Sequence, residues 1–240
     1  MRLTTLVPIV ALAFGAFNGP SNAGASSQPD AQERMAALKK SLGENQARLR
    51  EYEWIETTRV LVKGDEKSRR QLRCYYGADG TLQKLPVASE PQAASSGRGR
   101  RGGGPLMKAV VEHKKEEMQD YMERAADLVH MYVPPDAARM KANKDAGKTV
   151  LRPLEQGRVR IELAGYLKPG DLLSMDVVTA TSQIGALTVA SYLTEPQDAV
   201  NLAVQFALLM DGTSYPAQST LDAPAKNVRI VVSNSGYRLR

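Results

Sequence analysis

The spacing of apolar residues changes from a helical to a strand-like period early in this chain. Residues 30–52 carry Met and Leu side chains at roughly helical spacing with charges between them, which predicts an amphipathic helix. Residues 54–62 alternate instead and are rich in β-branched side chains, as strands are. A second alternation begins at Leu72, and an Asp-Gly hairpin signal leads into a return strand over residues 82–87. The pattern therefore predicts an N-terminal helix followed by three antiparallel strands.

Residues 88–104 differ in composition from the segments on either side. Ala, Ser, Pro, Gly and Arg dominate there, and such a segment buries too little apolar surface to offset the entropy of ordering it. We therefore expect a disordered, solvated loop. Residues 105–146 predict a helical insertion, because an apolar stripe follows one long helix to about Tyr132. Pro134 and Pro135 end that helix, and a shorter one follows.

The chain returns to alternation from about residue 158 onward. Short strands recur there with Pro-Gly and Asp-Gly turns between them, and residues 200–208 alternate most cleanly. This spacing predicts an antiparallel meander rather than βαβ units. Each strand has one apolar face, which the amphipathic helices can cover. The predicted fold class is therefore α+β, a curved antiparallel β-sheet (an unclosed half-barrel) packed on the N-terminal helix and the helical insertion, in a single domain over residues 24–240.

The first residues of the chain have the features of an export signal. Arg2 is the only charge before Asp30, and the apolar run over residues 6–17 is too short to span a bilayer. A tripeptide of small residues ends at Ala23, like a signal-peptidase site. Residues 1–23 are therefore predicted to be a cleaved signal peptide, with an uncleaved anchor as the alternative, and the protein is expected to be periplasmic or secreted. No later stretch approaches membrane-spanning length.

Charge and cysteine content narrow the classes of partner. The net charge is +6, but one Arg leaves with the signal peptide and three lie within residues 97–102, which leaves about +2 for the rest. Because no basic residues cluster on one face, no nucleic-acid partner is predicted. The Arg/Gly run either is a solvated linker or binds anionic polymers and head groups. The single cysteine, Cys74, excludes an intrachain disulfide and is interpreted as a buried strand residue, with a reactive thiol as the alternative.

No catalytic or metal-binding pattern assembles from the sequence. His113 and His130 are the only histidines and lack metal-ligand spacing, and there is no cysteine cluster and no G-x-S-x-G elbow. Residues 97–102 match G-x-G-x-x-G, but they lie in a linker and not at the strand-to-helix turn of a βαβ unit. We therefore predict a non-enzymatic protein that uses no cofactor and no metal. An envelope enzyme of unrecognised type is a third alternative.

Three segments of the sequence resemble the periplasmic lipoprotein carriers of the LolA-like group. They are Tyr52-Glu-Trp-Ile-Glu-Thr-Thr58, Tyr76-Gly-Ala-Asp-Gly-Thr-Leu82, and the C-terminal run from Val204 to Ser233. The chain also resembles uncharacterised bacterial exported proteins. In the LolA-like group an unclosed β-barrel curls around helices, and a hydrophobic hollow between them holds acyl chains or another apolar ligand. The resemblance implies an exported binding or carrier protein for a lipid or a hydrophobic small molecule.

Seven residues are the candidates for lining such a cavity: Trp54, Met118, Met122, Ile161, Met175, Val204 and Phe206. Methionines suit the purpose because they adapt to apolar ligands of different shape. Ordinary core packing is the alternative for each of the seven. The alternative function is that of a structural or interaction module, which recruits an envelope protein partner through an exposed sheet edge or through the basic linker.

Overall fold

The computed structural model describes residue 40 and residues 43–87 and 105–240. The predicted signal peptide and the predicted loop over residues 88–104 lie outside the described residues, as does most of the predicted N-terminal helix. The last part of that helix is described, and residues 43–49 are helical.

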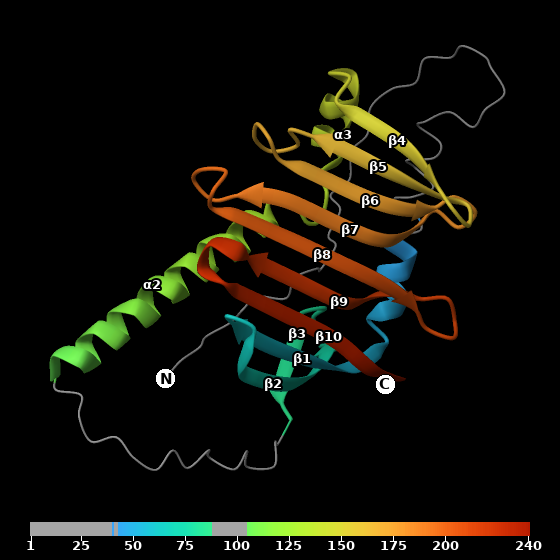
Figure 1. Cartoon of the computed structure of the whole chain (residues 1–240). Helices are drawn as coiled ribbons and strands as arrows, with labels where there is room; N and C mark the ends of the chain where they lie inside the picture. Colours follow the sequence, from blue (N-terminus) through green and yellow to red (C-terminus); the bar gives the residue numbers. More distant parts are fainter. Residues whose placement is uncertain (1–39, 41–42, 88–104) are drawn as a thin grey trace.

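The described residues form a ten-stranded sheet accompanied by helices (Figure 1). The strands are β1 (Tyr52–Val62), β2 (Asp65–Tyr76), β3 (Leu82–Pro86), β4 (Thr149–Leu154), β5 (Arg158–Ala164), β6 (Leu172–Val178), β7 (Gln183–Tyr192), β8 (Ala199–Leu208), β9 (Ser214–Ala223) and β10 (Val228–Leu239). Helices α2 (Pro105–His130) and α3 (Ala137–Asp145) stand between β3 and β4 in the chain, and the 3-10 helix η1 (Pro224–Lys226) connects β9 to β10.

All neighbouring strands of the sheet are antiparallel, in the order β3-β2-β1-β10-β9-β8-β7-β6-β5-β4. The two runs of strands predicted from the sequence thus form one sheet, which is joined where the first strand pairs with the last. Tyr52 of β1 lies opposite Leu239 of β10, and Val62 lies opposite Val228. Strands β3 and β4 have one neighbour each, so the sheet is open, as predicted.

Two strands differ from the sequence-based expectation. β2 begins at Asp65, well before the alternation at Leu72. Its first seven residues are all exposed and carry no apolar face, so no alternation marks them. β4 begins two residues after Gly147, ahead of the alternation expected from about residue 158, and its Val150 and Leu151 side chains are exposed. Both segments lack the half-buried pattern that marks a strand in a sequence, so alternation does not reveal their extent.

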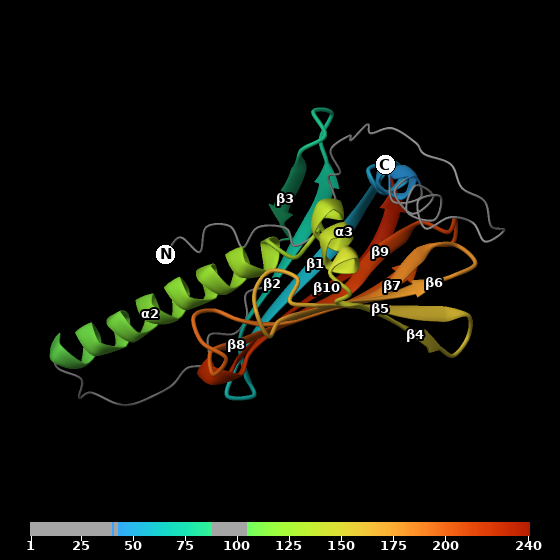
Figure 2. The same ribbon diagram turned by 90° about the horizontal axis from the view of Figure 1, so that it is seen from above.

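The helical insertion links the two edges of the sheet, because it leaves β3 at one edge and enters β4 at the other. Figure 2 shows α2 and α3 on the same side of the sheet, with the first half of α2 extending past it. The predicted stripe on the second half of α2 is buried against the strands through Tyr121, Ala125, Leu128 and Val129. We call the face that α2 contacts the inner face and the opposite one the outer face.

The core consists of cross-strand rows on the inner face. One row is almost completely buried over six successive strands, in the order Leu163, Leu173, Val189, Leu202, Leu221 and Ile230. These residues form one cluster with the stripe of α2. A smaller, separate cluster contains Trp54, Leu72 and Cys74 near the opposite edge of the sheet.

Candidate functional site

A second cross-strand row on the inner face changes from buried to exposed toward the β4 edge. Val204, Leu187 and Met175 are no more than 2% exposed, Ile161 of β5 is half-buried, and Leu151 of β4 is 64% exposed. Apolar side chains therefore continue along this face of the sheet beyond the part that the packed core covers.

Further half-buried apolar residues lie beside this row, nearer to the β4–β5 turn. Val159 of β5 lies opposite Val177 of β6 and next to the exposed Pro153 of β4. Phe206 follows Val204 by two residues on the same face of β8 and packs against the core cluster. We define the apolar shelf as Leu151, Val159, Ile161, Val177 and Phe206.

Six of the seven predicted ligand-contact residues lie in or against one cluster, as follows: Ile161, Met175 and Val204 in a single row, Phe206 beside it, and Met118 and Met122 on α2. Trp54 belongs to the smaller cluster instead. Met175 and Val204 are already buried by protein, so a ligand on this face would not touch them directly. The contact role of the seven residues stays a prediction.

Sequence reasoning did not single out Leu151, Val159 and Val177, which belong to the shelf. Leu151 lies on β4, before the alternation that begins at about residue 158. The signal that marks this segment is the pair of glycines, Gly147 and Gly157, that bound the short run Thr-Val-Leu-Arg-Pro-Leu, since glycines at turns with positive φ delimit strands.

The chain between β7 and β8 forms a hollow of about 260 Å³. It is lined by Thr194, Glu195, Gln197 and Asp198, which are polar or charged. A hollow with such walls differs from the hydrophobic one that the LolA-like resemblance implies. The apolar shelf is therefore the better candidate surface for an apolar ligand.

A buried polar junction fixes the segment directly after α2 to the sheet. The Tyr132 hydroxyl donates to Asp171 Oδ2 and lies 2.8 Å from Ser191 Oγ. The same carboxylate oxygen accepts the backbone N–H groups of Leu167 and Lys168 at 2.9 and 2.8 Å. Burial, and then the hydrogen bond to Asp171, raises the pKa of Tyr132, so the phenol stays a neutral donor. The junction holds the loop between β5 and β6 against the helix that covers the core.

The smaller cluster surrounds Cys74 with aromatic rings. The Trp54 ring stacks on Tyr237 with centroids 5.5 Å apart, and Tyr76 lies 5.9 Å from Trp54. Cys74 is completely buried among them, as the sequence predicts. Burial raises the pKa of its thiol to about 11, because a thiolate loses hydration there.

We expect Cys74 to react with Ellman's reagent at pH 8 at least about a hundredfold more slowly in the folded protein than in the same chain unfolded in denaturant. The thiolate is the reacting species, and both its fraction and its accessibility are reduced. Because the folded state holds this proton more tightly than the unfolded chain does, the thiol also favours folding below pH 9, and that contribution is lost as the pH rises toward 11. Equal labelling rates in the two states would contradict the burial of Cys74.

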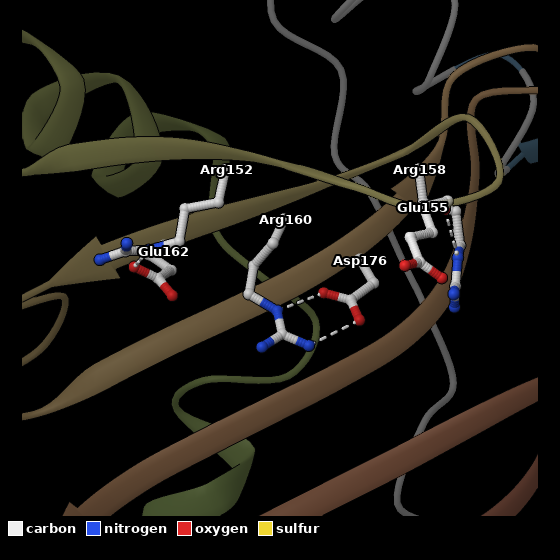
Figure 3. Close-up of polar contacts among 6 residues, drawn as sticks. All are labelled: Arg152, Glu155, Arg158, Arg160, Glu162 and Asp176. Carbon is white, nitrogen blue, oxygen red and sulfur yellow. Dashed lines mark hydrogen bonds and ion pairs between the residues drawn. The ribbon is translucent and has the colours of Figure 1, made fainter.

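The outer face near β4 carries arginines that are paired with carboxylates (Figure 3). Arg160 contacts both oxygens of Asp176 at 2.6 and 2.8 Å, and Arg152 contacts Glu162 at 2.7 Å. The hydrogen bond from Arg160 holds the pKa of Asp176 below its usual range. These positive charges are neutralised locally, so this surface does not present the basic patch that a polyanion needs.

The described residues contain neither a group of metal ligands nor a membrane-spanning helix. No three His, Cys, Asp or Glu side chains in residues 43–87 and 105–240 are grouped so that they could hold a metal ion. Within the same ranges, no helix has the length and apolar character needed to cross a membrane.

Comparisons with known proteins identify one distant structural similarity. No family model matches the sequence, and no curated protein matches it. Among solved structures, the fold is similar to the crystal structure of a DUF1329 family protein from Desulfovibrio piger, with 9% identity and a TM-score of 0.38 over 85% of this chain and 92% of that one. A similarity at this level supports no conclusion about function.

Proposed function

We propose that the protein is a non-enzymatic binding or carrier protein of the cell envelope, whose ligand is a lipid or another apolar molecule. The ligand lies on the apolar shelf of the inner face, where the sheet curves as a half-barrel beside its helices. The predicted signal peptide supports the compartment, and the LolA-like resemblance supports the ligand class. The observation that carries the proposal is the apolar row that continues from the buried Met175 to the 64% exposed Leu151.

The shelf favours an apolar ligand because covering it removes hydrocarbon from water. Leu151, Ile161 and Val177 lie on neighbouring strands about 4.8 Å apart, so an extended acyl chain that crosses the strands would touch each in turn. Each methylene group that is buried contributes about 0.8 kcal/mol. A chain of several methylenes therefore has enough surface for binding without a charged or metal-bound group.

The edges of the sheet favour this reading over the recruitment of a partner strand. Successive residues of an antiparallel strand direct their backbone groups alternately toward and away from the neighbouring strand. Ala164 N–H donates to Lys148 O, so the backbone of Lys148 is directed toward β5, and that of Pro153, five residues later, is directed away from it. At the other edge, Val87 N–H donates to Gln71 O, so the backbone of the preceding residue, Pro86, is directed away from β2. Both edges thus lack a donor where an added strand needs one, as protected edges do.

Titration with a fluorescent acyl probe tests the proposal. Leu151→Asp places a charge on an exposed position of the shelf, and we expect it to weaken binding of the probe at least about tenfold without loss of folding. The matched control is Leu85→Asp, at an apolar position that is 41% exposed on the outer face of the opposite edge strand. The control should bind like the unchanged protein. Absence of binding, or equal affinities of the two variants, would refute the proposed site.

A further inference from the structure

The apolar side of β8 leads from the shelf to a turn that projects into solvent. Along the inner face of β8, Val204 is 1% exposed, Phe206 is half-buried and Leu208 is 57% exposed. Met210, in the turn that follows the strand, is fully exposed. Exposure therefore rises toward the turn between β8 and β9, in the same way as it rises across the strands toward Leu151. The apolar side of β8, which begins at the shelf, is thus followed in the chain by a fully exposed apolar side chain.

The turn that carries Met210 is held rigidly. Asp211 accepts the backbone N–H and the hydroxyl of Thr213, each at 2.9 Å, and Leu209 exchanges backbone hydrogen bonds with Gly212 and Thr213. Gly212 adopts a φ of 80°, which few other residues tolerate. The turn therefore presents Leu208 and Met210 to solvent on a backbone that loses little further entropy on contact.

The neighbouring chain end carries an exposed leucine and an arginine beside two tyrosines. The Tyr52 hydroxyl donates to Asp211, and Leu239 lies opposite Tyr52 and is 64% exposed. Arg240 lies 4.0 Å from the centre of the Tyr75 ring, and the C-terminus and the β8–β9 turn lie at the same end of the sheet (Figure 1). Exposed aliphatic residues beside tyrosines and arginines suit the boundary between head groups and acyl chains.

We propose that this end of the sheet, formed by Leu208, Met210 and Leu239, docks on the surface of a lipid bilayer. Contact at the turn places the apolar side of β8 between the bilayer and the shelf. Passage of a ligand along β8 from the bilayer to the shelf rests on the proposed function, whereas the docking itself needs no bound ligand. Because carboxylates such as Asp211 and Glu51 lie among the arginines, attraction is mainly hydrophobic, and binding should change little with salt.

A fluorophore placed on the turn tests the docking directly. Cys74 is buried, so a polarity-sensitive probe attached through Met210→Cys labels one site of the full chain. On addition of phosphatidylcholine vesicles, we expect its emission to shift to the blue and to gain at least about threefold in intensity, as for a probe that leaves water. The matched control is the same label at Met131→Cys, a position that is 50% exposed at the end of α2, and its emission should not change.

Three results would overturn the docking proposal. One is an unchanged emission at position 210, and another is the same change at positions 131 and 210. The third is a blue shift that grows with protein concentration in the absence of vesicles, which would assign the turn to a contact between copies of the chain. Addition of the vesicles without any acyl ligand separates this test from that of the shelf, since the acyl probe is titrated without vesicles.

Discussion

Replacement of Asp171 by alanine is expected to lower the free energy of unfolding by about 3–5 kcal/mol, since each buried donor that loses its acceptor costs about 1–3 kcal/mol. The substitution leaves the Tyr132 hydroxyl and the backbone N–H groups of Leu167 and Lys168 without their common acceptor. Urea denaturation monitored by circular dichroism measures the change.

Two conservative variants separate the hydrogen bonds of this junction from simple loss of volume. Asp171→Asn keeps an acceptor at the same place and should cost less than the alanine variant. Tyr132→Phe removes one donor only and should cost about 1–2 kcal/mol. A loss below about 1 kcal/mol for Asp171→Ala would show that the junction does not hold α2 to the sheet.

The second large effect is expected in the most buried row of the core. Leu202 of β8 is 1% exposed and lies between Val189 and Leu221 on neighbouring strands. Leu202→Ala removes three carbon atoms and leaves a cavity, so the free energy of unfolding should fall by about 3–4 kcal/mol. Chemical denaturation again gives the value.

Leu208→Ala on the same strand is the matched control for this prediction. Leu208 is 57% exposed, so its truncation should change the free energy of unfolding by less than about 1 kcal/mol. Equal losses in the free energy of unfolding for the two variants would contradict the difference in burial between Leu202 and Leu208.

Alternation predicted most of the C-terminal strands because they are half-buried. Val200, Leu202 and Val204 point to the core while the residues between them do not, so one face can be read from the sequence alone. The same reading put Ile161, Met175 and Val204 on apolar faces, and the structure joins them in one row.

The pairing of β1 with β10 could not be predicted in the same way. Tyr52 and Leu239 are neighbours across the sheet, yet no local pattern relates residues so far apart in the chain. The degree of exposure along the shelf depends on where α2 packs, which is again a property of the whole fold. Asp171 could be recognised as a turn residue, and two of its donors, Leu167 and Lys168, lie in the same loop. Its third donor, Tyr132, lies 39 residues away in the chain, and no local pattern relates the two.

The apolar surface differs in form from the one that the LolA-like resemblance implies. The resemblance predicts a hydrophobic hollow between the sheet and the helices, whereas the described residues present an apolar shelf that opens toward β4 and toward the β8–β9 turn. An open shelf suits a ligand that is exchanged rather than stored, because part of the ligand stays accessible.

Native mass spectrometry of the protein purified from its own envelope, followed by lipid extraction, tests the proposed function most directly. A lipid or other apolar molecule bound at near-stoichiometric level, and lost from Phe206→Asp, is the predicted result. A mass equal to that of the chain alone, together with no uptake of a fluorescent acyl probe, would contradict it.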